Sequence, residues 1–253
     1  MRVRFSSVAL ATVALLAVAT VPSVVAGQAL PSAKELMDKH DAAVGGRAAL
    51  DKHSSVRRAG SMSIPAMGME GQIEMMGDKA GRFVQKISLG PVGDVMQGYD
   101  GKTAWVVQPG MGPMVLDGDQ AKEMVRQGDF FGGLHDITNY TSAETVEIAD
   151  FDGRKCYKVK LVRKAGGEGF EFFDAATGLT AGVVRDVDSP MGKVTTTQIV
   201  GEYKDFGGVK IPTKIQNKNP QFDMTMAFSA IEFDKVDAAA FNLPDAVKPL
   251  VKP

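Results

Sequence analysis

The sequence contains few side chains that could act as a nucleophile or a general base. Its three histidines are His40, His53 and His135, and Cys156 is its one cysteine. The local patterns of zinc proteases, serine hydrolases, phosphate-binding loops and dinucleotide sites are absent from the sequence. Asp136 follows His135 directly, but sequence neighbours rarely orient one another, and no nucleophile motif accompanies the pair. We therefore expect a protein that is not an enzyme, with no catalytic residues and no cofactor.

The histidines and the cysteine have ordinary structural roles open to them. His40 lies on the apolar stripe of a predicted helix, where a buried, hydrogen-bonded imidazole is the usual finding. Cys156 begins a predicted strand, and a single thiol without a nearby histidine motif is most often a small buried side chain. One cysteine also means that the chain forms no internal disulfide and depends on its core for stability.

Methionine is unusually dense in one short stretch. Five methionines lie within the 19 residues of segment 61–79: Met62, Met67, Met69, Met75 and Met76. A flexible, polarizable side chain of this kind can fill a core, contact ligands of variable shape or bind a soft metal such as Cu(I). The pairs Met67/Met69 and Met224/Met226 resemble fragments of copper sites. A spacing of two in a strand also places both side chains on one apolar face, so we predict no metal site.

Period-two alternation indicates that these methionines belong to β-strands. From Met69 to Met75 the even positions are polar and the odd ones are Met, Ile or Gly, which is typical of a strand with one dry face. We expect the following side chains to line an apolar ligand-binding cavity on that face: Met62, Ile64, Met69, Ile73, Met75, Phe83, Ile87, Trp105, Phe172, Met224, Met226 and Phe228. The same stripes would also serve as an ordinary core, which is their more common role.

Helix and turn signals define the elements that would position this face. Ser32 and Glu35 form a capping-box pattern that begins a helix over 32–44, and Gly128 ends a second predicted helix over 117–127. Tight-turn signals recur between the short apolar runs: Asp100-Gly101, Asp152-Gly153, the loop 174–178 and Gly207-Gly208. The predicted fold class is α+β, with a curved antiparallel half-open barrel and helices covering its concave face.

The N-terminus predicts export. Arg2 and Arg4 precede the apolar run 8–21, and Val24-Val25-Ala26 places small residues before Gly27, which is the layout of a cleaved signal peptide. We predict a signal peptide over 1–26 and a single domain over 27–253 that is soluble in the periplasm and has no transmembrane segment. This mature chain has 27 basic and 30 acidic residues and no basic block, so nucleic acid is not an expected partner.

Three passages together resemble a known family: residues 42–65, 96–113 and 203–215. The segments 151–161 and 171–186 lie between the second and the third of them. They are similar to outer-membrane lipoprotein-sorting-like domains of the LolA/LolB/RseB-type superfamily, over roughly 42–241. The resemblance implies an open antiparallel barrel around a helical lid, with a hydrophobic cavity between them. It also implies a lipid or lipoprotein acyl chain as ligand, with the protein acting as carrier or sensor.

Two alternatives remain open from the sequence. The first is an envelope accessory module whose cavity is filled by its own side chains and whose partner is another envelope protein. The second, less favoured, is a soft-metal (copper) chaperone that uses the methionine pairs.

Overall fold

The structure is a computed structural model that describes residues 29–189 and 192–251. The predicted signal peptide over 1–26 lies outside the described residues. Thirteen strands form one antiparallel sheet: β1 Ser55–Ile64, β2 Met69–Asp78, β3 Phe83–Ser88, β4 Asp94–Tyr99, β5 Ala104–Gln108, β6 Gly112–Leu116, β7 Tyr140–Phe151, β8 Arg154–Arg163, β9 Glu168–Asp174, β10 Thr180–Ser189, β11 Gly192–Asp205, β12 Lys210–Lys218 and β13 Asp223–Phe233.

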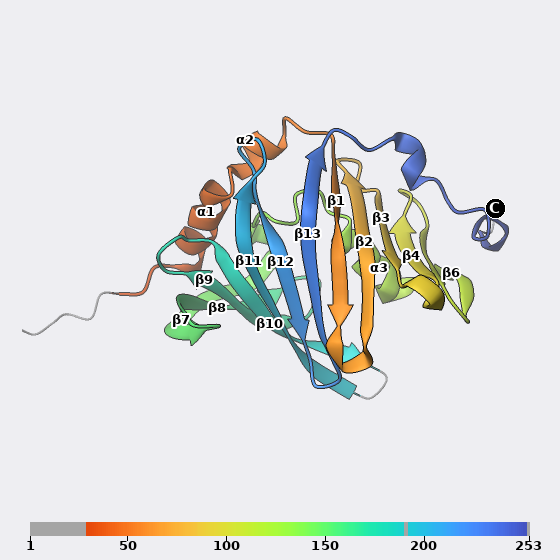
Figure 1. Ribbon diagram of the computed structural model, residues 1–253. Helices are drawn as coiled ribbons and strands as arrows, with labels where there is room; N and C mark the ends of the chain where they lie inside the picture. The colour runs from red at the N-terminus through yellow and green to blue at the C-terminus, as the bar shows by residue number, and fades with distance from the viewer. Residues whose placement is uncertain (1–28, 190–191, 252–253) are drawn as a thin grey trace, which may run out of the picture.

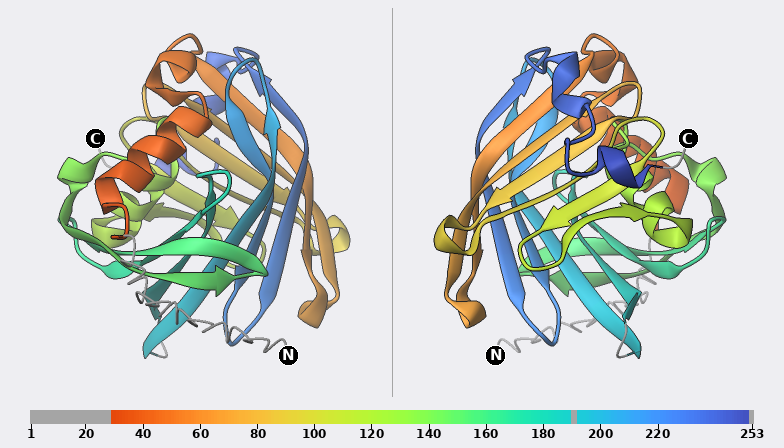
Figure 2. Two further views of the ribbon diagram at one scale, coloured as in Figure 1. Left: turned by 90° about the vertical axis from the view of Figure 1, so that its left-hand side faces the viewer. Right: turned by 90° about the vertical axis from the view of Figure 1, so that its right-hand side faces the viewer.

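The strand order joins two meanders at a central seam. Strands β1 to β6 are neighbours in sequence order, as are β7 to β13, and β1 pairs with β13 between them. Strands β6 and β7 are the two edges, so the sheet is not closed. Figures 1 and 2 show that the sheet is strongly curved. At the seam, a Cβ on Gly60 would lie 2.0 Å from the carbonyl oxygen of Ala227, so the close approach of the two backbones there requires glycine.

The predicted turn signals all lie between paired strands. The Asp100 carboxylate accepts hydrogen bonds from the backbone N–H groups of Lys102 and Thr103, which closes the β4–β5 turn. Asp152 and Gly153 both have positive φ, at 52° and 73°, and join β7 to β8. Two successive left-handed residues match the twist of the flanking strands, which is why Asp-Gly is a strong hairpin signal.

The helices are short and contact different regions of the sheet. Their bounds are α1 Ala33–Ala43, α2 Gly46–Leu50 and α3 Gly118–Gln127, with 3-10 turns at Pro65–Met67, Gly90–Val92, Ile137–Asn139, Ala238–Phe241 and Lys248–Leu250. The capping box at α1 is confirmed, because Ser32 and Glu35 each accept the other's backbone N–H, and Gly128 ends α3 as predicted. No helix of the described residues is long and apolar enough to cross a membrane.

Each helix buries a few apolar side chains against the strands. In α1, Leu36 and Met37 pack on β8 and β9, where they meet the fully buried Val159 and Phe173. In α3, Met124 packs against Phe83 of β3 and Ala104 of β5. The largest apolar cluster lies between these regions and contains Met62, Ile73, Met226 and Phe228 together with Leu50 of α2.

The opposite face of the sheet carries its own smaller clusters. Trp105 and Val84 are covered by Phe241 and Val247 from the C-terminal segment, which Figure 2 shows beside β4–β6. At the other end of the sheet, Phe172 stacks on Phe151, with ring centroids 4.1 Å apart, near the fully buried Cys156. The prediction that Cys156 is a buried thiol is therefore confirmed.

Candidate functional site

A cavity of about 730 Å³ lies between the sheet, the helices and the segment 128–136 that follows α3. This volume is within the range of roughly 300–1,000 Å³ typical of small-molecule sites. Side chains from both meanders line it, including Met75 of β2 and Val183 of β10. We call the face of the sheet that borders this cavity the inner face.

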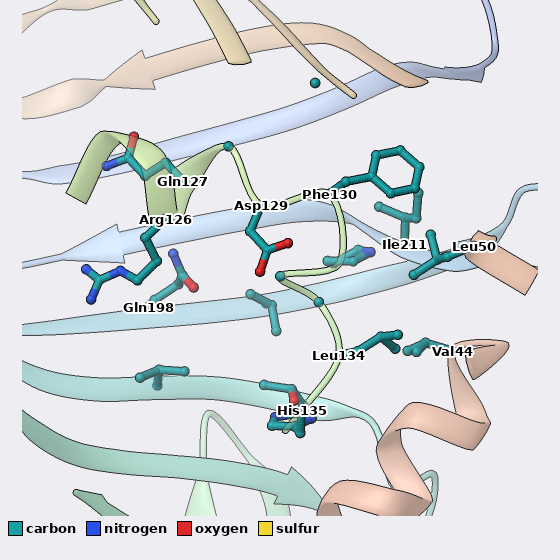
Figure 3. A pocket seen from close by; sticks show the side chains of 18 of the residues that line it. Val44, Leu50, Arg126, Gln127, Asp129, Phe130, Leu134, His135, Gln198 and Ile211 are labelled. Carbon is teal, nitrogen blue, oxygen red and sulfur yellow. The ribbon is translucent and has the colours of Figure 1, made fainter. Parts of the chain in front are cut away.

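One end of the cavity is apolar. In Figure 3, Val44 at the end of α1 lies beside Leu134, and Leu50 lies near Ile211 of β12. Val209 and Phe130 also line this end. Leu50, Val209 and Ile211 belong to the large cluster around Ile73, so the apolar end is continuous with the methionine-rich part of the inner face.

The other end is polar and basic. Figure 3 shows Arg126 extending from α3 toward Gln198 of β11, whose amide donates a hydrogen bond to Asn217 Oδ1 at 3.0 Å. Arg163 and Arg185 line the cavity as well. Arg185 pairs with Thr196 of β11. Along that strand, Thr196 is two residues from Gln198 and four residues from Val200, which pairs with Ile215 of β12. The cavity therefore has a charged end and an apolar end.

His135 joins the segment 128–136 to α1 and to the sheet. Its Nδ1 lies 2.9 Å from Asp41 Oδ1, and its Nε2 lies 3.2 Å from both carboxylate oxygens of Glu171 on β9. Burial alone would lower the pKa of His135, but the charges and hydrogen bonds of Glu171 and Asp41 more than offset it and raise that pKa to about 10. An imidazolium at His135 donates to both carboxylates.

Glu171 is held ionised by the same contacts. Its burial opposes ionisation, yet the charge and hydrogen bond of His135, followed by the hydrogen bond from Thr180 at 2.8 Å, hold the pKa of Glu171 below its usual value. Asp41 also accepts the backbone N–H of His135. The network thus fixes the course of the segment that borders the cavity.

His40 is a buried, hydrogen-bonded histidine, as predicted. Its Nδ1 accepts the backbone N–H of Thr180 at 2.9 Å, and its Nε2 donates to the carbonyl of Gly133 at 3.2 Å. Burial and then the charge of His135 hold its pKa below the usual value, which matches a neutral ring. His40, Asp41 and His135 lie close enough together to bind a metal ion. Both ring nitrogens of both histidines already have protein partners, so the hydrogen bonding of this group is complete without one.

The predicted lining residues are distributed over three places. Met75 and Phe83 line the cavity itself. Two further sets lie in or against the adjoining apolar cluster: buried Met62, Ile73, Met226 and Phe228, and half-buried Ile64, Met69, Ile87 and Met224. Trp105 and Phe172 lie in the clusters on the opposite face, because each alternates with an inward-facing neighbour. Ligand binding by these residues stays a prediction.

Sequence reasoning did not identify the polar end. Arg185, Gln198 and Glu171 lie on strands in the alternating positions that normally face solvent, and nothing in their local pattern distinguishes a wet cavity from a wet surface. His135 was noted beside Asp136, but its partners are Asp41 and Glu171, while Asp136 accepts the N–H of Thr138.

Comparison with known proteins places the chain by its fold. No family model matches the sequence, and no curated protein matches it. Three solved structures are similar at 12% sequence identity. A DUF1329 family protein from Desulfovibrio piger has a TM-score of 0.57, over 83% of this chain and 97% of that one. A LolA superfamily protein from Nitrosomonas europaea has a TM-score of 0.54, over 85% and 99%.

The third is a domain named for outer membrane lipoprotein sorting from Vibrio parahaemolyticus, with a TM-score of 0.54 over 82% of this chain and 95% of that one. These likenesses extend over most of each chain. The resemblance drawn from the sequence is therefore confirmed at the level of the fold, which this chain shares with these three structures.

Proposed function

We propose that this protein binds the acyl chain of a lipid or lipoprotein in the cavity, as a non-enzymatic carrier or sensor in the periplasm. The observation that carries the proposal is a cavity of about 730 Å³ with an apolar end, on the inner face of a LolA-like sheet. Each methylene of an acyl chain that leaves water contributes about 0.8 kcal/mol. An apolar site of this size needs no reactive group to bind such a ligand.

In this proposal the mature domain, residues 27–253, follows a signal peptide over 1–26 and acts as one unit. The helices α1 and α3 and the segment 128–136 cover the inner face, with His135 as the contact that holds the cover in place. Half-buried methionines beside the cavity adapt to chains of different shape. Other envelope proteins that deliver or receive the lipid are the expected protein partners.

The test is the ligand content of protein purified without detergent from the periplasm of an expression host. Organic extracts are examined by mass spectrometry, and binding of diacylglycerol with two six-carbon chains is measured on the delipidated protein. We expect an acyl-containing species near one per chain and a measurable affinity for the added lipid.

Met75→Gln and Met96→Gln form a matched pair for this test. Met75 lines the cavity, while Met96 packs on the opposite-face cluster around Trp105. Met75→Gln should weaken binding about tenfold, because an amide replaces an apolar contact, and Met96→Gln should leave it unchanged. Empty wild-type protein that is folded and binds no added lipid would contradict the proposal and favour the accessory module with a filled core.

A further inference from the structure

We infer that the basic end of the cavity binds the anionic, phosphate-bearing headgroup of the lipid whose chains occupy the apolar end. This inference rests on the proposed function and specifies the class of ligand. It is carried by Arg126, Arg163 and Arg185, which we call the arginine cluster. These residues come from α3, β8 and β10 and line one cavity.

Two members of the arginine cluster have no carboxylate partner. In the part of the chain that the structure describes, neither Arg163 nor Arg185 makes an ion pair or a side-chain hydrogen bond; Arg163 lies 5.6 Å from the Tyr140 ring centroid. Arg126 pairs with Glu123 of its own helix. Arginine forms bidentate hydrogen bonds with phosphate and carboxylate groups, so an unpaired guanidinium inside a cavity is a site for such a group.

The arginines are close enough to repel one another. Burial and then the charges of Arg185 and Arg163 hold the pKa of Arg126 below its usual value, and burial followed by the charge of Arg163 does the same for Arg185. Arg163 is half-buried, whereas Arg126 and Arg185 are exposed at the polar end of the cavity, so solvent reduces the repulsion between these like charges without removing it. A bound anion would remove this repulsion.

The acidic side chains around the cavity do not supply that opposite charge to the two free arginines. Four acidic residues line it, and each has another partner: Glu123 with Arg126, Asp129 with the backbone N–H of Phe131, Asp136 with Thr138, and Glu171 with His135. The protein as a whole has a formal charge of −1, so the excess of unpaired positive charge is local to this cavity.

The backbone leaves room beside the arginine cluster. Leu161, Gly169 and Arg185 are paired in a row across β8, β9 and β10, and Arg163 follows Leu161 on the same face. A Cβ on Gly169 would lie 2.7 Å from the carbonyl oxygen of Val184 and 3.1 Å from Arg185 Cβ, so the close approach of β9 and β10 beside Arg185 requires glycine. Glycine thus leaves the position between Leu161 and Arg185 without a side chain.

The arrangement of the two ends matches an amphiphile. Figure 3 shows Arg126 and Gln198 on one side of the cavity and Leu50 and Ile211 on the other. A headgroup at the arginine cluster would direct its chains toward Leu50 and Ile211, where the cavity joins the apolar cluster. A neutral headgroup would offer these arginines no opposite charge.

The experiment compares three ligands on the delipidated, full mature protein: phosphatidic acid with two six-carbon chains, the diacylglycerol with the same chains, and glycerol 3-phosphate. We expect phosphatidic acid to bind at least about tenfold more tightly than diacylglycerol. Arg163→Gln and Arg185→Gln should each remove most of this preference and leave diacylglycerol affinity within about twofold. Arg57→Gln, on the opposite face, is the matched control and should change neither affinity. Met75→Gln should weaken both lipids equally.

Each remaining outcome overturns a distinct statement. Equal affinity of wild-type protein for the two lipids would overturn the headgroup inference and leave acyl-chain binding intact. Binding of neither lipid would overturn the proposed function. Glycerol 3-phosphate bound as tightly as phosphatidic acid would show a site for a free phosphate compound and overturn the assignment to a lipid headgroup.

Discussion

The two halves of the inner face follow the same strand alternation but present opposite chemistry. Except for Arg58, the inward side chains of β1, β2 and β13 are apolar, and Met62, Ile73 and Phe228 bury one another. On β9, β10 and β11 the inward positions hold Glu171, Arg185 and Gln198. Apart from Arg58, the first half is complete without a partner. The second contains charges that depend on distant residues or have no partner, so the first half favours stability and the second favours recognition.

The largest expected effect lies in the charged half, at His135. Replacing it with alanine leaves Glu171 buried without its positive partner, which should lower the free energy of unfolding by about 3–5 kcal/mol. Urea denaturation measures the loss. His53→Ala is the control, because His53 contacts the exposed Asp234 and its loss should cost less. Equal losses for the two variants would remove the distinction between the halves.

The apolar half should respond through packing alone. Ile73 is 1% exposed at the centre of the large cluster, so Ile73→Ala should lower the free energy of unfolding by about 3 kcal/mol through lost burial and a cavity. The reference is Gln198→Ala in the polar half, which removes one hydrogen bond to Asn217 and should cost about 1 kcal/mol. A larger loss for Gln198→Ala would reverse the proposed division of roles.

Alkaline pH should weaken only the charged half. Because the pKa of His135 is raised to about 10 in the folded protein, its stabilising contribution is complete below its ordinary value of 6.5 and is lost as pH rises toward 10. The slope for one proton is at most about 1.4 kcal/mol per pH unit. We expect stability to decline between pH 7 and 9 more steeply in wild type than in His135→Ala, as measured by urea midpoints. Parallel curves would show that the carboxylates of Asp41 and Glu171 do not keep His135 protonated in this pH range.

The smallest effect should have the opposite sign. Arg58 lines the cavity without an ion pair in the described part of the chain, and burial holds its pKa below the usual value. Arg58→Met should therefore raise the free energy of unfolding by about 1 kcal/mol. Arg57 bonds Glu74 and Glu232 on the opposite face, so Arg57→Met should not stabilise. Destabilisation by Arg58→Met in thermal melts would show that this arginine has a structural partner.

The apolar half could be predicted from the sequence because its signals are local. The alternation around Ile73 indicates both a strand and its dry face, and the capping box at Ser32 and the Asp152-Gly153 turn each act within a few residues. Trp105 has an equally apolar strand environment, but its face is covered by the C-terminal segment, which no pattern near Trp105 indicates.

The charged half could not be predicted, since its contacts are distant in sequence. His135 meets Asp41 across a separation of 94 residues and Glu171 across 36. A polar residue on a strand has the same sequence pattern whether it faces solvent or a cavity. The sequence around Arg185 therefore does not distinguish it from an ordinary surface residue. Alternation identifies which residues share a face, and only the curvature identifies what that face surrounds.

The central seam between β1 and β13 pairs segments that are far apart in the sequence. Val56 pairs with Phe233, so the middle of the sheet consists of the first and last strands of the chain. Contacts between residues far apart in sequence form late and slow the folding rate. The two meanders can form hairpins early, but they join only after the C-terminal strand is free. A chain with this topology lacks its central pairing until β13 is available to pair with β1.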